Sequence, residues 1–335
     1  MIKYLTEFLN LQMYKPALVN IDLTYSCPLH CVSCRRGSAR EYENELKYKD
    51  YITIFQELRD WNISNVIICG GEPFMRKDIF KIIHESRINN IYPHLVTNGY
   101  LLNNHKIRIL KKLGINLMSI SLNSSNQRIH DATRGIKGSY KKIISTIKEL
   151  RKSNIKIILF TLMLKQNLDT IPNLIHWAKK NYLNIKLQMF VSPDLMFYAK
   201  DSYDAQKNEN ITYDNLWFKH NNNWIFNDKK IKKVFNQIID MKLHGYPILN
   251  PVWQLRYFEQ YYRNPLVPLP FRCELGNTNL SIDPYGNVRL CYAMSRLGNV
   301  TKEKLKKIWN SKEAHHLRKK IERCKLNCKL MQCGY

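Results

Sequence analysis

The sequence predicts an α/β fold in which six parallel strands alternate with helices, followed by a small C-terminal segment built on a β-hairpin. Two observations carry this prediction. Between residues 17 and 190, short apolar segments that suit buried strands are separated by amphipathic segments with helical spacing. From residue 271 the pattern changes to a hairpin and a charged helical segment. Strands that alternate with helices form parallel sheets joined by right-handed crossovers.

The predicted strands are the apolar segments 17–25, 65–73, 92–99, 115–123, 155–164 and 184–190. The predicted helices lie near residues 50–60, 78–88, 104–113, 139–153 and 169–182. Polar residues or glycine follow four of the strands, at positions 24–26, 70–72, 97–99 and 121–123. Because these positions share the carboxyl edge of the sheet, where α/β barrels keep their active sites, we expect the functional site there.

The rest of the chain divides into two further segments, so the predicted organisation is 1–191, 192–265 and 266–335. Residues 192–265 read as an irregular bridge with a helix near 229–243. Its aromatic residues are Phe197, Tyr198, Trp217, Phe218, Trp224, Phe226, Trp253, Tyr257 and Phe258. In the last segment, "LSIDPYGNVRLC" predicts a hairpin with Pro284, Tyr285 and Gly286 at its turn, and residues 301–324 carry a helical charge pattern.

The formal net charge of +26, from 53 Lys+Arg against 27 Asp+Glu, raises the question of nucleic-acid binding. The basic residues are scattered and form no long block, so we interpret them as a solvated surface and do not expect a nucleic-acid partner. The N-terminus lacks the features of a signal peptide, and no segment has the roughly 20 apolar residues of a membrane span. We therefore expect a cytoplasmic protein.

The nine cysteines fall into two groups and one single residue. Cys27, Cys31 and Cys34 follow the first strand at C-x3-C-x2-C spacing, and Cys69 is assigned to the core. The second group is Cys273, Cys291, Cys324, Cys328 and Cys333. Because disulfides are rare in the cytoplasm, two thiolate clusters are the natural interpretation.

Thiolates select zinc, copper(I) or iron–sulfur clusters. A [4Fe–4S] cluster ordinarily takes four cysteines, so three in one short loop leave one iron open to a small molecule. A zinc site with a distant fourth ligand such as His30 is the alternative.

With this three-cysteine loop the sequence resembles the radical SAM enzymes, whose defining motif it is. The resemblance covers roughly residues 17–190 and implies a partial (βα)6 TIM-like barrel. It implies that S-adenosylmethionine chelates the open iron and that an electron from the cluster releases a 5′-deoxyadenosyl radical. The residue before the third cysteine is usually aromatic in this family, whereas here it is Ser33.

The resemblance also implies cofactor contacts at later strand ends. In "CGGEPFMRKDIF", Gly70 and Gly71 would let the backbone approach the methionyl end of the cofactor, and Glu72 would help to fix its amino group. The remaining implied cofactor contacts are Thr97, Asn98, Ser121, Asn123 and Arg134. His130 and Asp131 are equally compatible with a structural and a functional role.

The C-terminal cysteines resemble those of the SPASM or shorter twitch domain, which adds auxiliary iron–sulfur clusters to radical SAM cores. The full pattern has seven cysteines and two clusters, whereas this chain offers five. We expect one auxiliary [4Fe–4S] cluster on Cys273, Cys291, Cys324 and Cys328, with Cys333 spare or substituting. A zinc site and free core thiols are the alternatives. Which four thiols ligate, and whether one iron stays open, the sequence leaves undecided.

The resemblance implies hydrogen-atom abstraction from a peptide or a small metabolite, in a dehydrogenation, crosslinking or related modification. It also implies an electron donor such as flavodoxin or ferredoxin. The chain begins almost directly at the first strand, so we expect no separate N-terminal peptide-recognition domain, which favours a compact substrate. The alternatives are a radical SAM enzyme that modifies RNA, and a non-catalytic iron–sulfur or zinc protein that binds nucleic acid or a partner.

Overall fold

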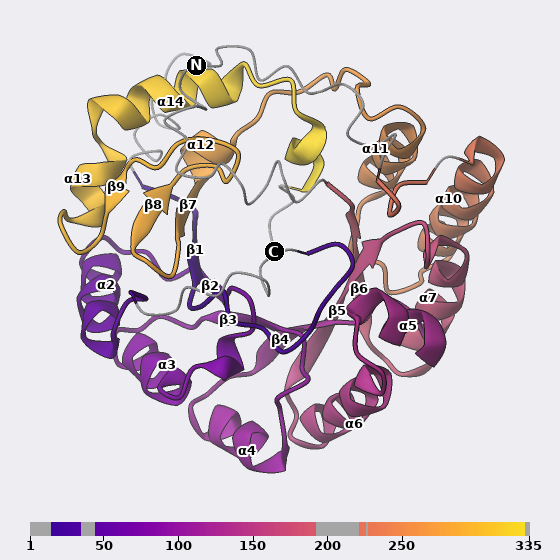
Figure 1. Ribbon diagram of the computed structural model, residues 1–335, viewed down its shortest axis with the longest axis horizontal. Helices are drawn as coiled ribbons and strands as arrows, with labels where there is room; N and C mark the ends of the chain where they lie inside the picture. The colour runs from indigo at the N-terminus through magenta and orange to yellow at the C-terminus, as the bar shows by residue number, and fades with distance from the viewer. Residues whose placement is uncertain (1–14, 35–43, 192–220, 226, 332–335) are drawn as a thin grey trace.

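In the described part of the chain, nine strands form one sheet with helices around its outer side (Figure 1). The computed structural model describes residues 15–34, 44–191, 221–225 and 227–331. The strand order is β6-β5-β4-β3-β2-β1-β7-β8-β9. The first six strands pair in parallel, which confirms the predicted α/β class and leaves the C-terminal strands to extend the sheet beyond β1.

The parallel strands are β1 (Leu18–Asp22), β2 (Val66–Cys69), β3 (His94–Thr97), β4 (Leu117–Ser121), β5 (Lys156–Met163) and β6 (Asn184–Met189). All six lie within the segments that the sequence predicts as strands. Apolar residues on both faces of these strands are buried, as in β1, where Leu18, Val19 and Ile21 are all less than a tenth exposed. Burial on both faces is the reason why these strands read as near-continuous apolar runs.

The helices that follow the strands of the core are α2 (Tyr48–Asp60), α3 (Ile79–Ile88), α4 (Asn104–Lys112), α5 (Gln127–Arg134), α6 (Ser139–Lys152) and α7 (Ile171–Lys180). The later helices are α10 (Asp228–Leu243), α11 (Val252–Arg263), α12 (Leu275–Thr278), α13 (Leu305–Trp309) and α14 (Lys312–Glu322). Short 3-10 helices are η2 (Pro73–Met75), η3 (Leu168–Thr170) and η4 (Asn327–Met331). The five helices predicted in the core, the helix near 229–243 and the helical tail are all present.

Besides the four-residue helix α12, two described helices are absent from the sequence prediction, and each has a physical reason. Helix α5 buries the polar residues His130, Asp131 and Thr133, so it lacks the apolar periodicity that marks an amphipathic helix. Helix α11 buries Leu255 and Phe258 at helical spacing. The sequence prediction has an irregular segment there because the many aromatic residues obscure this spacing. Phe258, Tyr261 and Tyr262 belong to the core, whereas Trp253 is 49% exposed.

The C-terminal hairpin continues the core sheet. Strand β7 (Asn279–Ile282) pairs in parallel with β1, and β8 (Asn287–Arg289) and β9 (Gly298–Asn299) follow in antiparallel order. The turn lies at the predicted position, where Asp283 accepts backbone hydrogen bonds from Tyr285 and Asn287. Because β7 lies beside β1, the loops that follow both strands emerge at the same edge of the sheet.

Aromatic packing joins the C-terminal helices to the core as well. Trp309 of α13 lies edge-to-face against Trp61, with ring centroids 6.2 Å apart, and both belong to the same apolar cluster. The Leu305 backbone N–H donates to Glu57 Oε2 at 2.7 Å. The predicted division at residue 266 remains a prediction, but these contacts make the two parts one packed unit.

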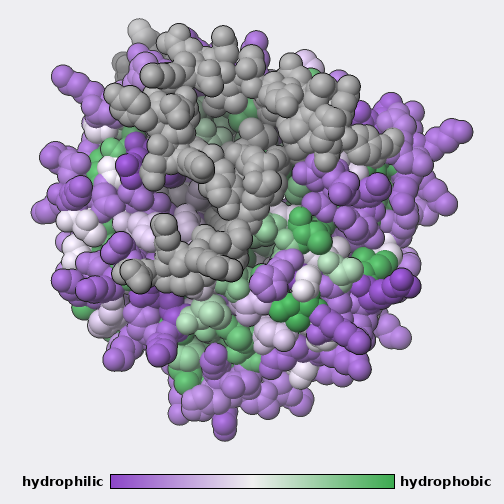
Figure 2. Space-filling view, viewed as in Figure 1, coloured by the Kyte–Doolittle hydropathy of each residue, from purple (hydrophilic) through white to green (hydrophobic). Residues whose placement is uncertain are grey.

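Some sequence predictions fall outside the described residues. They include Cys333, the bridge residues 192–220 with their aromatic side chains, and Phe226. Among the helices that the structure describes, none is long and apolar enough to cross a membrane. Hydrophilic residues dominate the periphery of the face shown in Figure 2.

We predict that Gly135→Ala destabilises the protein far more than Gly245→Ala. Both glycines have a left-handed φ, of +70° and +73°, so alanine costs about 1–2 kcal/mol at either position. A Cβ at Gly135 would lie 2.1 Å from the His30 carbonyl oxygen, whereas none of the described atoms lies within 4 Å at Gly245. Urea unfolding should show an additional loss of about 1–3 kcal/mol for Gly135→Ala. Equal losses would contradict the described packing of the 26–34 loop on α5.

Candidate functional site

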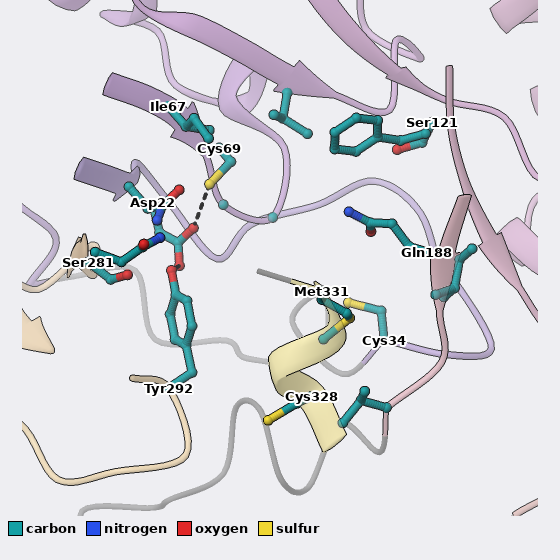
Figure 3. Close-up of a pocket in the computed structure, with 18 of the residues that line it drawn as sticks. Asp22, Cys34, Ile67, Cys69, Ser121, Gln188, Ser281, Tyr292, Cys328 and Met331 are labelled. Carbon is teal, nitrogen blue, oxygen red and sulfur yellow. Dashed lines mark hydrogen bonds between the residues drawn. The ribbon is translucent and has the colours of Figure 1, made fainter. Parts of the chain in front are cut away.

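A cavity of about 750 Å³ extends along the strands to the carboxyl edge of the sheet, where the sequence predicts the site. Side chains from the six parallel strands, from β7 and from the last described residues line it. Most of the predicted site residues line it, namely Cys27, Cys31, Cys34, Gly70, Gly71, Thr97, Asn98, Ser121, Asn123, Arg134, Cys291 and Cys328. The structure thus brings both groups of cysteines to one space (Figure 3).

The loop that carries Cys27, Cys31 and Cys34 is held by backbone hydrogen bonds on two sides. On the β2 side, Gly71 N donates to Thr24 O at 2.6 Å and Glu72 N to Ser26 O at 2.7 Å. On the α5 side, His30 N donates to Arg134 O at 3.2 Å and Val32 N to Thr133 O at the same distance. These hydrogen bonds fasten the loop to the turn after β2 and to the end of α5.

The three thiols of this loop form one group beside two polar side chains. Asn98 Nδ2 lies 3.5 Å from Cys27 Sγ, and Arg134 Nη1 lies 3.7 Å from Cys31 Sγ. Burial raises the pKa of the Cys27 thiol to about 12 although a backbone hydrogen bond from Leu29 lowers it. The neighbouring charges of Glu72, Cys31 and Cys34 contribute to this increase.

This donor set fits a metal cluster. Each thiol must lose its proton to bind a metal, and N–H groups beside the sulfurs stabilise the negative charge of the resulting thiolates. Cys27, Cys31 and Cys34 are the residues that could hold the predicted cluster. Within the described residues, no three His, Cys, Asp or Glu side chains converge closely enough to hold a single metal ion.

Gly70 and Gly71, which follow β2, have a structural role in addition to the predicted one of letting the backbone approach the cofactor. A Cβ at Gly70 would lie 2.5 Å from Thr24 O, and one at Gly71 would lie 2.4 Å from Ser26 O. Both distances are shorter than any tolerated contact, so only glycine lets this turn pack on the cysteine loop. The same two residues also line the cavity.

Glu72 lies behind the cavity wall and is not among the residues that line it. Its side chain is fully buried and accepts hydrogen bonds from Thr97 Oγ1 at 2.7 Å, Asn98 N at 2.8 Å and Phe74 N at 3.2 Å. These contacts fasten the end of β3 to the turn after β2. The structure thus gives Glu72 a positioning role, while its predicted contact with the cofactor remains a prediction.

Asn123 and Arg134 meet at the end of β4. Arg134 Nη2 donates to Asn123 Oδ1 at 3.4 Å, and Asn123 Nδ2 donates to Thr133 Oγ1 at 3.2 Å. The Arg134 guanidinium therefore contacts both the Asn123 amide and the Cys31 thiol. Ser121, the last residue of β4, lines the same wall of the cavity.

His130 holds this wall from behind, which favours its structural interpretation. Its Nδ1 accepts a hydrogen bond from Asn123 N at 3.2 Å, so the ring proton is on Nε2. Burial, together with the nearby Arg134, lowers the pKa of His130 to about 3. Asp131 accepts hydrogen bonds from Gly138 N, Ser139 Oγ and Tyr140 N, and so caps the start of α6.

Four of the five C-terminal cysteines form the second group. Burial, together with the nearby thiols of Cys273 and Cys324, raises the pKa of Cys291 to about 12. Burial also raises the pKa of Cys328 well above its ordinary value, with contributions from the other three thiols. Cys273, Cys291, Cys324 and Cys328 are therefore neighbours and could hold the predicted auxiliary cluster.

The polar cluster around Asp22 is absent from the sequence predictions. The structure corrects the assignment of Cys69 to the core, because Cys69 lines the cavity and donates its S–H to Asp22 Oδ1 at 3.1 Å. The Tyr292 hydroxyl donates to Asp22 Oδ2 at 3.3 Å (Figure 3). The available signal was Asp22 itself, a carboxylate inside an apolar strand, since buried carboxylates need partners.

Two family models match the chain. The Radical SAM superfamily model matches residues 21–178, and the SPASM model, an iron–sulfur cluster-binding domain, matches residues 273–333. The first domain binds a [4Fe–4S] cluster and S-adenosylmethionine, and the second binds an auxiliary iron–sulfur cluster.

Two curated proteins resemble the N-terminal half. The chain is 30% identical over 166 residues to the AdoMet-dependent heme synthase of Methanosarcina barkeri, a match that covers 49% of this chain and 48% of that protein. It is 28% identical over 169 residues to the PqqA peptide cyclase of Rhodopseudomonas palustris, covering 49% of this chain and 44% of that protein. The chain thus matches half or less of the length of either relative.

Among solved structures, Streptococcus suis SuiB bound to its precursor peptide SuiA has a similar fold. The TM-score is 0.68 at 15% identity, and the match covers 92% of this chain and 69% of that one. At this identity the similarity concerns the fold.

We predict that replacing His130 reduces the loss of stability in acid. The unfolded chain binds the His130 proton with a pKa near 6.5, and the folded chain binds it only near 3, so stability falls as pH falls between these values. At pH 5 the cost is about 2 kcal/mol relative to pH 7.5. Urea unfolding at both pH values should show a smaller difference for His130→Gln than for the wild type. An equal difference would mean that His130 is protonated in the folded protein.

Proposed function

We propose that this chain, which belongs to the radical SAM superfamily and carries a SPASM iron–sulfur domain, modifies a peptide by a reaction that begins with hydrogen-atom abstraction. The observation that carries the proposal is the single cavity, because thiols of both cysteine groups line it. A substrate bound there would lie between the two candidate iron–sulfur sites. That arrangement suits a reaction in which the substrate loses a hydrogen atom and then an electron.

Each group of residues has a proposed task. Cys27, Cys31 and Cys34 would hold the cluster that, together with S-adenosylmethionine, supplies the 5′-deoxyadenosyl radical. Asn98 and Arg134 would stabilise the charge on these sulfurs. Gly70, Gly71, Thr97, Ser121 and Asn123 would form the wall against which the cofactor binds.

The C-terminal thiols have a separate proposed task. Cys273, Cys291, Cys324 and Cys328 would ligate one auxiliary [4Fe–4S] cluster, with Cys333 spare. With all four irons capped, such a cluster exchanges electrons and leaves the cavity to the substrate. An electron donor such as flavodoxin or ferredoxin would supply the electrons for the reaction. The cytoplasm remains the predicted location of the protein.

A peptide suits the charges of the cavity better than a polyanionic metabolite does. Among the described lining residues, Arg134 is the only cation, and it lies beside Cys31. Apolar residues such as Phe160 and Leu162 and neutral polar residues such as Gln188 form most of the remaining wall. A substrate with several carboxylates would find few counter-charges there. The names of the PqqA peptide cyclase and of the SuiA complex of SuiB agree with a peptide.

A small metabolite is the second candidate. The similarity to an AdoMet-dependent heme synthase favours it. The two candidates differ in the molecule that reacts, so one assay separates them.

We predict that replacing Cys27, Cys31 and Cys34 together by alanine abolishes 5′-deoxyadenosine formation and lowers the iron content from about eight to about four per chain. The matched control Cys69→Ala should keep about eight irons, because Cys69 donates its proton to Asp22 and is not a proposed ligand. Iron analysis after anaerobic reconstitution gives the answer. About eight irons in the triple variant would indicate two auxiliary clusters, and zinc in their place would make the C-terminal site structural.

We predict that the reduced enzyme modifies a peptide encoded near its own gene and releases one 5′-deoxyadenosine for each hydrogen atom abstracted. Mass spectrometry should show hydrogen loss from the peptide in the wild type and none with the triple cysteine variant. Modification of a tetrapyrrole but of no such peptide would replace the peptide proposal with the metabolite one.

A further inference from the structure

A buried lysine lies among the segments that carry the second cysteine group. Lys329 belongs to η4, follows Cys328 directly and is only 7% exposed. Its ammonium group donates a hydrogen bond to the Phe271 carbonyl oxygen at 2.7 Å, two residues before Cys273. The same nitrogen lies 5.5 Å from the centroid of the Phe271 ring. Both partners are neutral, so these contacts solvate the ammonium group without cancelling its charge.

The short helix that carries this lysine is anchored at its start. Asn327 Nδ2 donates to the carbonyl oxygen of Pro265 at 2.8 Å and to that of Val267 at 2.9 Å. With the bond from Lys329 to Phe271, three hydrogen bonds join η4 to the segment that leads to Cys273. The ammonium group therefore has a defined position relative to the thiols on both segments.

The charge of Lys329 acts on the second cysteine group. Burial raises the pKa of the Cys324 thiol, whereas the positive charge of Lys329 lowers it. At Cys291 the corresponding cation is Arg289, which is only partly buried. Lys329 is thus the more deeply buried of the two cations. A charge that is shielded from water is screened less, so it acts more strongly on its surroundings.

A fixed cation beside a cluster affects the two oxidation states unequally. Four thiolates give a [4Fe–4S] site a net negative charge, and one added electron makes that charge more negative. The attraction of a nearby cation therefore stabilises the reduced state more than the oxidised state. Net charge, hydrogen bonds and exposure to solvent are the properties by which a protein sets the reduction potential of such a cluster.

We propose that Lys329 raises the reduction potential of the auxiliary cluster held by Cys273, Cys291, Cys324 and Cys328, so that this cluster accepts the electron that the substrate loses. The inference rests on the proposed function. There the hydrogen atom goes to the 5′-deoxyadenosyl radical, and the remaining substrate radical is oxidised by one electron and releases a proton to solvent. The auxiliary cluster is reduced by that one electron, and an oxidised electron carrier takes it up afterwards.

The test is a redox titration of the full, anaerobically reconstituted chain. The midpoint potential is read from the electron paramagnetic resonance signal that does not respond to S-adenosylmethionine. Lys329→Gln removes the charge but keeps an N–H donor, so it should lower the equilibrium constant for reduction roughly tenfold, which is about 59 mV for a one-electron couple. Lys329→Arg keeps the charge and should stay near the wild-type potential.

The matched control is Lys325→Gln. Lys325 follows Cys324 directly, as Lys329 follows Cys328, but it is exposed to solvent. Water and salt screen its charge, so this variant should shift the potential much less than Lys329→Gln. Lys329→Met is a second uncharged variant and should give the same lower potential. Iron content, measured on the same samples, shows that each variant holds its clusters.

An unchanged potential in Lys329→Gln and Lys329→Met would overturn the inference. An equal shift in Lys325→Gln would overturn it too, and so would an equal shift in Lys329→Arg, because packing and not charge would then set the potential. Zinc in the C-terminal site would have the same consequence. The proposed function is tested separately by peptide modification. If peptides react while Lys329→Gln keeps the wild-type potential, the inference alone fails.

Discussion

The close packing of the turn after β2 on the cysteine loop is the constraint on which the rest of the site depends. Gly71 N and Glu72 N donate to Thr24 O and Ser26 O, and a Cβ at either glycine would lie 2.4–2.5 Å from a backbone oxygen of that loop. The same turn carries Glu72, whose carboxylate fastens the end of β3. One contact between two backbones therefore sets the position of three thiols and of the residues at the next strand end.

The second determinant is the pairing of β7 with β1. Because a parallel partner starts and ends at the same edges, the hairpin places Cys291 and Tyr292 beside the cavity that the core strands form. The 3-10 helix η4 brings Cys328 and Met331 to the same space (Figure 3). The two cysteine groups, although far apart in the sequence, thus share one cavity, which suits a substrate that exchanges a hydrogen atom with one site and an electron with the other.

The sequence was sufficient for the parts of the structure that depend on local pattern. The six strands, the core helices and the hairpin turn follow from apolar periodicity and turn chemistry, and the two thiol groups follow from cysteine spacing. The pairing of β7 with β1 could not be predicted, because strand order depends on long-range packing. Helix α5 was missed because it buries polar residues such as His130. Cys69 was assigned to the core because its hydrogen-bond partner, Asp22, lies 47 positions earlier on another strand. The buried Asp22 was the one local signal that could have indicated a polar cluster.

The most direct test of two distinct iron–sulfur sites is the electron paramagnetic resonance spectrum of the reduced, reconstituted protein, recorded with and without S-adenosylmethionine. A cluster held by the three thiols of the N-terminal loop has an open iron, so its signal should change when S-adenosylmethionine binds. A cluster capped by Cys273, Cys291, Cys324 and Cys328 should give a second signal that stays the same. We therefore expect one signal that shifts and one that does not. A spectrum in which no signal responds, or in which every signal responds, would contradict it.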